Sequence, residues 1–330
     1  MSTKNSLKIG NLELKSNVIL APMAGLTDTV YRKLIRKYTT DCLLSTEMIS
    51  SEALIHNQKG NILKYEDVEM PLSFQLSGHK PDVMARAARF LNDFATVIDI
   101  NMGCPVNKIV KGSDGSGLMK TPDLACDIVK AVKDVVDVPV TVKTRLGWDS
   151  TSLNFVEFAQ MLEQAGADAI TIHCRTRSQM YSGNADWKML SKLKGKLGVP
   201  LVANGDVTSP ETAEKCLKFA YADAIAIARQ SIGNPDLLFR VDYYLKTGKL
   251  QPKMSLKEKM ENLIEHLEGE MSLRGKLVGI KFMRKFYAYY INSFANASNI
   301  RQKLIVSEDL DEIMYYLNEI INRADELVMM

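Results

Sequence analysis

The sequence has no apolar run that approaches the roughly 20 residues needed to span a bilayer. Residues 1–7 are polar and contain no apolar signal core, so we expect a cytoplasmic protein with no membrane partner. Its five cysteines are far apart, without CxxC or HxxxH spacing, which argues against a disulfide framework and against a bound metal. A formal charge of +3 on 330 residues is too small to indicate a nucleic-acid partner by itself.

Short, unalternating runs rich in Val, Ile or Ala recur through residues 1–230, as expected for strands buried on both faces of a parallel sheet. The predicted strands are 18–21, 42–45, 72–75, 97–101, 140–143, 169–173, 201–203 and 224–228. Amphipathic helical stretches separate them, at 80–92, 124–135, 153–164, 187–193 and 210–219. The alternation predicts an α/β protein with a (β/α)8 TIM barrel. A doubly wound open sheet is the alternative, but no GxGxxG follows the first strand.

The chain changes character after residue 239. Residues 245–254 contain Gly248 and Pro252 and are typical of a linker. Helical patterns follow at 256–271, 275–291, 299–305 and 309–327, with no strand pattern among them. We therefore predict a barrel at residues 1–245 and a small helical bundle at 246–330.

Polar residues gather where a barrel places its chemistry, at or just after the predicted strand ends. They are Gln75, Asn101, Lys143, Arg145, His173, Asn204, Asp206 and Arg229. One polar residue at a strand end carries little information, but the repetition around the barrel predicts a single polar pocket.

Cys104 lies at this predicted face, just after the strand 97–101 and before a loop, 106–117, that carries three glycines. A cysteine thiol is mostly protonated at neutral pH and can give up a proton. Cys104 is therefore a candidate acid in a reaction that forms a C–H bond. The alternative is a small buried loop residue, the usual fate of a free cysteine.

Several motifs together resemble the tRNA-dihydrouridine synthases, most closely the bacterial B-type enzymes. In chain order they are APMAGLTD at 21–28, QLSG at 75–78, NMGCP at 101–105, VKTRLGW at 142–148, HCRTR at 173–177 and NGD at 204–206. The resemblance extends over about residues 10–240 and continues more weakly through 283–285. It implies an FMN-dependent enzyme that reduces a specific tRNA uridine to 5,6-dihydrouridine, with NADPH or NADH as reductant.

The resemblance also implies roles for individual residues. Cys104 would be the catalytic proton donor to C5 of uracil, after a hydride from reduced FMN reaches C6. Residues expected to bind FMN are Pro22, Met23, Ala24, Gln75, Asn101, Lys143, His173, Asn204, Gly205, Asp206, Ala228 and Arg229. Ala228 and Cys174 stand where the family commonly has glycine, and the Ala228 methyl would narrow the phosphate site.

RNA contacts are expected on the helical tail and at the barrel mouth. Residues 271–306 contain seven Lys or Arg and no Asp or Glu, a pattern that favours a localised phosphate contact. The aromatic residues among them are expected mostly to pack in the bundle. The predicted RNA-binding residues are Arg145, Arg175, Arg177, Lys281, Arg284 and Lys285.

Two other functions are compatible with parts of this pattern. An FMN barrel that acts on a free pyrimidine, similar to dihydroorotate dehydrogenases, would share the flavin chemistry but would not need a basic helical tail. A non-catalytic RNA-binding protein would not need Cys104, Lys143 or Arg229. We expect the tRNA enzyme, acting as a monomer.

Overall fold

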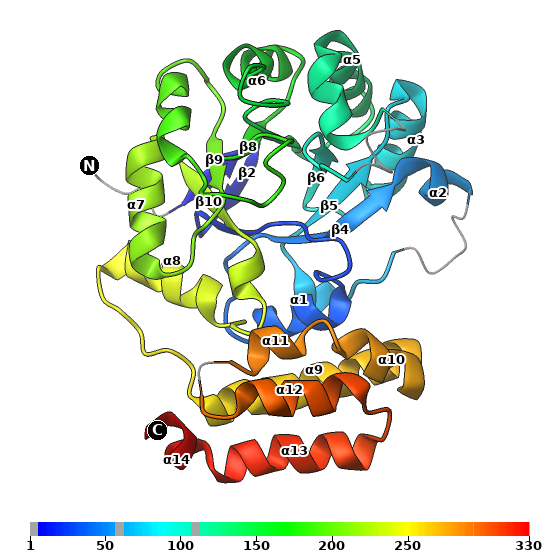
Figure 1. Ribbon diagram of the computed structural model, residues 1–330. Coiled ribbons are helices and arrows are strands. Elements are labelled where there is room, and N and C mark those ends of the chain that lie inside the picture. Colours follow the sequence, from blue (N-terminus) through cyan, green and yellow to red (C-terminus); the bar gives the residue numbers. More distant parts are fainter. Residues whose placement is uncertain (1–5, 57–62, 107–112, 293, 330) are drawn as a thin grey trace.

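The computed structural model describes residues 6–56, 63–106, 113–292 and 294–329. Half of the predicted glycine-bearing loop, residues 107–112, and residues 1–5 of the polar N-terminal stretch therefore lie outside the described residues. A barrel of strands and helices forms the larger part, and helices of the C-terminal tail lie against one side of it (Figure 1).

Eight parallel strands form the barrel, in the spatial order β3-β10-β9-β8-β7-β6-β5-β4. Their bounds are β3 Val18–Leu20, β4 Leu44–Ser50, β5 Leu72–Ser77, β6 Val97–Asn101, β7 Val140–Arg145, β8 Ala169–His173, β9 Leu201–Asn204 and β10 Ala224–Ile227. A parallel bridge between Ile19 and Leu43 joins the two ends of the order and closes the sheet. All eight predicted strands are present, with ends that differ by a few residues in most cases, and the TIM-barrel prediction is confirmed.

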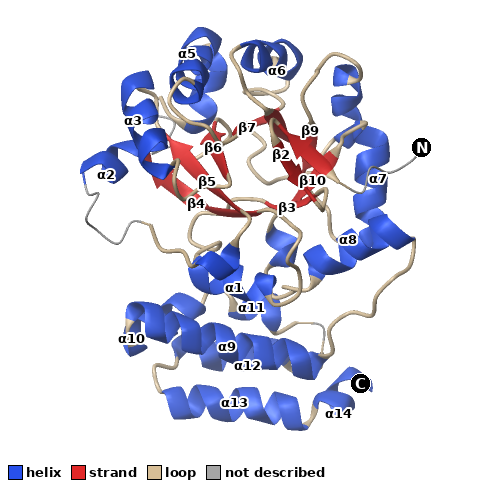
Figure 2. Cartoon of the chain, turned by 180° about the vertical axis from the view of Figure 1, so that it is seen from behind, coloured by secondary structure: helices blue, strands red, loops and turns tan. Residues whose placement is uncertain are grey.

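Helices surround the strands, which occupy the centre of the view in Figure 2. They are α1 Thr29–Arg36, α2 Ser51–His56, α3 Pro81–Leu91, α5 Pro122–Lys133, α6 Phe155–Gln164, α7 Pro210–Ala220 and α8 Leu237–Thr247. Short 3-10 helices add η1 Asp67–Glu69, η2 Gly115–Lys120, η3 Trp187–Leu193 and η4 Arg229–Ser231. The barrel-facing sides of these helices and the outer faces of the strands form one buried apolar core. This packing on both faces explains why the strands show no polar alternation.

A short hairpin that the sequence analysis did not predict precedes the barrel. Its strands are β1 Leu7–Ile9 and β2 Leu12–Leu14, paired antiparallel. Leu7, Ile9 and Leu14 are buried in one cluster with inward-facing residues of the barrel strands. The hairpin thus covers apolar side chains of the barrel interior.

The tail contains α9 Leu256–Arg274, α10 Lys276–Met283, α11 Tyr287–Tyr290, α12 Ala297–Val306, α13 Leu310–Asn322 and α14 Ala324–Met329. Helix α9 packs on α10 and α13 and also on α1 of the barrel (Figures 1 and 2). The predicted linker is shorter than expected, because α8 continues to Thr247. Among the described residues, no helix is long and apolar enough to cross a membrane.

The single helix predicted at 275–291 is wrong, because the structure has two helices there. The break follows Met283, where the Phe286 amide donates to the Met283 carbonyl at 2.8 Å, a tighter turn than an α-helix makes. The turn allows Phe286, Tyr287 and Tyr290 to be buried together in the tail core. These three rings are therefore packing residues, as expected.

Candidate active site

A cavity of about 740 Å³ opens at the carboxyl ends of the barrel strands, within the roughly 300–1,000 Å³ typical of small-molecule sites. The structure brings most of the predicted site residues to its wall. They are Pro22, Met23, Ala24, Gln75, Asn101, Cys104, Lys143, Arg145, His173, Asn204, Gly205, Asp206, Ala228 and Arg229. The expectation of one polar pocket at this face is confirmed.

Strand register places several of these residues side by side. Asn101 of β6 is level with Lys143 of β7, and His173 of β8 is level with Asn204 of β9. Neighbouring strands of a sheet lie about 4.8 Å apart, so side chains at level positions can contact one ligand. The register therefore explains why residues far apart in the sequence share one wall.

A chain of hydrogen bonds in the barrel fixes the backbone beside Cys104. The side-chain nitrogen Nε2 of Gln75 donates to Asp99 Oδ2 at 2.6 Å, and the side-chain nitrogen Nδ2 of Asn101 donates to Gln75 Oε1 at 2.7 Å. Asn101 Oδ1 then accepts from the backbone amides of Gly103 and Cys104. Asn101 therefore acts on Cys104 in this structure, by positioning its backbone.

Asp99 determines which groups donate and which accept along this series of hydrogen bonds. It is buried and also accepts from the Thr141 hydroxyl at 2.7 Å. Burial raises the pKa of Asp99 to about 6, and the hydrogen bonds from Thr141 and Gln75 oppose that rise. At neutral pH the carboxylate can only accept, so Gln75 must present its nitrogen to Asp99 and its oxygen to Asn101. The sequence analysis missed Asp99, although a carboxylate inside an apolar strand was the signal for it.

Lys143 brings a cation into the cavity wall. Its ammonium makes no hydrogen bond or ion pair with another of the residues that the structure describes. Burial lowers the pKa of Lys143 to about 8, with a further contribution from Arg145. A cation in this environment favours an electron-rich or anionic ligand, because such a ligand compensates for the lost hydration.

His173 is neutral and acts through hydrogen bonding. Burial, followed by Lys143, Arg145 and other nearby cations, holds the pKa of His173 far below its ordinary value. Its Nε2 lies 3.4 Å from a guanidinium nitrogen of Arg175, which can only donate. Nε2 is therefore the acceptor, and the ring proton is on Nδ1.

Gly205 and Asp206 form a narrow corner of the cavity. Gly205 has a φ of +123°, and a Cβ there would lie 2.9 Å from the Ala185 Cβ and 3.0 Å from the His173 ring. Asp206 accepts two hydrogen bonds from Arg175, at 3.0 and 2.7 Å, and one from the Ala185 amide. Burial alone would raise the pKa of Asp206, but the hydrogen bonds from Arg175 and the Ala185 amide, together with the charges of Arg175 and Arg229, outweigh it and lower the pKa. Asp206 is thus an anion already paired inside the protein.

Two of the predicted RNA contacts, Arg145 and Arg175, need correction. Each is 2% exposed. Arg145 donates to the carbonyls of Gly103, Thr176 and Met180. Besides its pair with Asp206, Arg175 donates to two carbonyls in the loop after β8. Both guanidiniums therefore support the cavity wall from inside and are not available on the RNA-facing surface.

Arg177 differs from these two arginines because it lies at the rim of the barrel. Its guanidinium carbon is 4.6 Å from the centre of the Trp148 ring, and Lys120 Nζ is 3.4 Å from the same centre. Two cations around one partly exposed indole make a surface suited to phosphate and base contact. Its RNA role stays a prediction.

The structure describes both positions at which the sequence departs from the family pattern. Ala228 has a φ of −117° and a ψ of −118°, a combination outside the α and β regions that residues other than glycine usually adopt. Cys174 is buried, and burial raises the pKa of its thiol to about 12.

The basic residues of the tail have different surroundings. Lys281 and Arg284 share one partner, Glu308, at 3.1 and 3.2 Å, so this exposed group keeps one excess positive charge. Lys285 donates to the Gly25 carbonyl of the barrel. Lys281 and Arg284 thus face outward, whereas Lys285 contacts the barrel.

Sequence reasoning missed two aromatic residues of the cavity, Tyr181 and Tyr289. Tyr181 is 52% exposed, and the guanidinium carbon of Arg229 lies 4.9 Å from its ring centre. An aromatic residue on the loop after β8 was the available signal. Tyr289 belongs to α11 of the tail. The apolar residues around Tyr289 in the sequence indicate packing, and nothing in that pattern shows that the tail reaches the cavity.

Comparisons with known proteins agree with the motifs. The family model for dihydrouridine synthase (Dus) matches residues 19–325. A protein named probable tRNA-dihydrouridine synthase 1, from Synechocystis, is 41% identical over 320 residues, which cover 96% of this chain and 90% of that protein. The tRNA-dihydrouridine synthase B of Vibrio cholerae is 37% identical over 308 residues, covering 93% of this chain and 96% of that protein.

Solved structures show the same fold at low sequence identity. An old yellow enzyme homologue from Zymomonas mobilis matches with a TM-score of 0.51 and 14% identity, over 78% of this chain and 96% of that chain. A 2-naphthoyl-CoA reductase matches with a TM-score of 0.56 and 14% identity, over 73% of this chain and 52% of that chain. The solved structures support the fold alone, whereas the sequence matches show the family. The chain belongs to the dihydrouridine synthase family.

Proposed function

We propose that this protein is an FMN-dependent tRNA-dihydrouridine synthase that reduces a uridine of tRNA with electrons from NADPH. The observation that carries the proposal is the position of Cys104. In a chain that belongs to this family, Cys104 lines a large cavity and follows Asn101, the residue of β6 that is level with Lys143 of β7. Such a cavity can hold a flat cofactor and a flat base together.

The residues present fit FMN. Arg229 is exposed at the cavity and can bind phosphate oxygens. Lys143 supplies a cation where the electron-rich ring would lie. His173 Nδ1 is a neutral donor for the ribityl chain or for uracil. The Pro22–Ala24 segment forms the floor.

The chemistry requires a hydride and a proton. FMN, held by Lys143, His173 and Arg229 and reduced by NADPH, would supply the hydride for C6 of uracil. The Cys104 thiol then gives its proton to C5, because the C5=C6 bond is conjugated with the C4 carbonyl and the negative charge spreads to that side. Solvent returns a proton to the sulfur. Cys104 therefore works as a general acid and must be protonated at the start of each turnover.

A uridine in folded tRNA must leave its stack to reach the cavity, which costs a few kcal/mol. Phosphate contacts offset that cost. Lys281 and Arg284 support such contacts on the tail, and Arg177 and Lys120 support them at the barrel rim. We assign catalysis to residues 1–245, whose rim also contacts RNA, and the main RNA-binding surface to residues 246–330.

We further propose that the protein acts as a monomer. Because the substrate is tRNA, we place it in the cytoplasm.

The test is direct. The purified protein is incubated with NADPH and tRNA from cells that lack dihydrouridine synthases, and nucleosides are analysed by mass spectrometry. We expect a yellow protein and dihydrouridine at a defined position. A flavin-bound protein that reduces free uracil derivatives but leaves tRNA unchanged would instead favour a free-pyrimidine reductase.

A further inference from the structure

We propose that Lys285 of the tail is a positioning residue for the flavin pocket, because it fixes the loop at residues 22–28, here called the floor loop. The inference rests on the proposed function and goes beyond it. Lys285 was expected to contact RNA, whereas its ammonium donates to the carbonyl oxygen of Gly25 in the floor loop. Pro22, Met23, Ala24 and Leu26 of this loop line the cavity.

The floor loop is bound on both sides of Gly25. The Gly25 amide donates to Oε1 of Glu47, which belongs to β4 of the barrel. Its carbonyl accepts from Lys285, which follows α10 in the tail. One residue of the floor loop is thus fixed between the barrel and the tail, and both contacts use a charged partner.

The conformation of Gly25 makes this approach possible. Its φ is +75°, in the left-handed region that favours glycine. A Cβ there would lie 3.4 Å from Lys285 Nζ, the nearest atom to it. That distance is an ordinary van der Waals contact, so the left-handed φ, rather than lack of space, is what favours glycine at this position.

Lys285 is oriented toward the barrel by aromatic contacts. Its Nζ lies 3.3 Å from the centre of the Phe282 ring and 5.2 Å from that of Phe286. Burial lowers the pKa of Lys285, while the nearby carboxylates of Asp28 and Glu47 oppose this. Lys285 is exposed like Lys281, but its ammonium is held over two rings and bonded to a carbonyl, so it is a poorer phosphate contact than Lys281.

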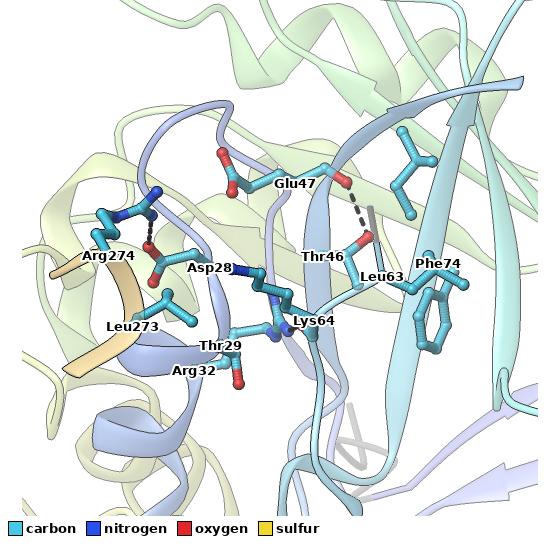
Figure 3. Close-up of a pocket in the computed structure, with 11 residues that line it drawn as sticks. Asp28, Thr29, Arg32, Thr46, Glu47, Leu63, Lys64, Phe74, Leu273 and Arg274 are labelled. Atoms are coloured by element: carbon cyan, nitrogen blue, oxygen red, sulfur yellow. Dashed lines mark hydrogen bonds and ion pairs between the residues drawn. The ribbon is translucent and has the colours of Figure 1, made fainter. Parts of the chain in front are cut away.

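A second contact between tail and barrel fixes the end of the same loop. Arg274 of α9 donates to Asp28 at 2.5 Å and to Glu270 at 2.5 Å. Asp28 in turn caps α1 by accepting from the Tyr31 amide. Figure 3 shows Arg274 and Asp28 facing each other, with Glu47 nearby, at a cavity of about 250 Å³ between the tail and the barrel. The tail therefore binds the floor loop at two positions, Gly25 and Asp28.

The experiment compares Lys285→Met with Lys281→Met in the full-length chain, without RNA. Both remove one positive charge from the same short stretch of the tail, but only the first removes the contact with the floor loop. FMN affinity is measured by flavin fluorescence quenching on the apoprotein, and the visible spectrum reports the surroundings of the ring. We expect Lys285→Met to raise the FMN dissociation constant about tenfold, the effect of losing one charged hydrogen bond, and to shift the flavin band.

Two further variants make the result specific. Lys285→Arg keeps a charged donor and should restore part of the affinity, whereas Lys285→Gln should behave like the methionine variant. Lys281→Met should bind FMN like the wild type. If Lys285→Met, with an unchanged melting temperature, keeps wild-type FMN affinity and spectrum, the positioning role is refuted. A wild-type protein that binds no FMN would refute the proposed function, and the inference with it.

Discussion

The hydrogen-bond chain beside Cys104 predicts an unusual response to Asn101→Asp. Asn101 accepts from two backbone amides with Oδ1 and donates to Gln75 Oε1 with Nδ2. A carboxylate at position 101 keeps the two amide contacts but turns its other oxygen toward Gln75 Oε1. Gln75 cannot rotate to relieve this, because its nitrogen is bound to Asp99. The substitution changes little in shape but places two acceptors face to face.

The magnitude follows from protonation. The contacts are restored only when Asp99 and the new carboxyl together take up one proton, so this pair holds a proton in the folded protein at a pH where the unfolded chain has lost it. The native state then binds more protons than the unfolded state, and the variant loses stability relative to the wild type as pH rises above about 4. Each pH unit costs about 1.4 kcal/mol, which gives about 3–4 kcal/mol at pH 7. For a chain of this size that corresponds to a melting temperature roughly 6–12 °C lower.

A second substitution should reverse the effect. In Asp99→Asn/Asn101→Asp, Gln75 can rotate and donate to the carboxylate at 101, while its oxygen accepts from the new amide at 99. The Thr141 hydroxyl then donates to the remaining amide oxygen, so every group in the chain has a partner. We expect the double variant to recover about 2 kcal/mol of the free energy of unfolding and to lose the steep pH dependence.

Thermal and urea unfolding of the wild type, both single variants and the double variant provide the assay, from about pH 5 to about pH 8. The loss of free energy of unfolding in Asn101→Asp should grow with pH. The double variant should lose less free energy of unfolding than the two single variants lose together. A deficit that does not change with pH, or simple additivity, would refute the assigned direction of the chain.

Three further outcomes follow from the site and the tail. Because the pKa of Lys143 is lowered to about 8, its cation is lost as pH rises through that value, so FMN affinity measured by fluorescence should fall between about pH 7 and pH 9 in the wild type and stay flat in Lys143→Met. Asp206→Ala leaves the Arg175 guanidinium buried without its carboxylate, and should lower the free energy of unfolding by about 3 kcal/mol in urea titrations. The double variant Lys281→Ala/Arg284→Ala should weaken tRNA binding and reduce its salt slope by about 1–2, with an unchanged flavin spectrum. Unchanged tRNA affinity would show that tRNA binds to a surface other than that of Lys281 and Arg284.

The barrel could be predicted from the sequence because each strand carries its own signal. β6 and β8 were predicted at their observed bounds, since an apolar run that ends in Asn101 or His173 marks both a buried strand and its functional end. The three-residue strands of the hairpin β1–β2 were missed because so short a segment has no measurable period. The break after Met283 was also missed, because the burial of Tyr287 and Tyr290 depends on the other tail helices.

The site was predicted at the level of which residues gather, but not of what each one contacts. Arg175 and Arg177 look alike in the sequence, yet the first is paired with Asp206, 31 positions along the chain, and the second lies at the rim. Lys285 looked like its neighbour Arg284, and only the fold places it on Gly25. Contacts with residues far away in the sequence determine whether a cationic side chain is bound within the protein or available to a ligand. A local sequence pattern does not reveal those contacts.

The central claim is that Cys104 gives the proton to C5 of a tRNA uridine, and one variant tests it most directly. Cys104→Ala, loaded with FMN and reduced by NADPH, is mixed with unmodified tRNA, and both flavin reoxidation and dihydrouridine are followed in a single turnover. We predict normal FMN binding, normal reduction by NADPH, and dihydrouridine formation slowed at least about a hundredfold, the usual contribution of a general acid. Dihydrouridine formed at the wild-type rate would contradict the account.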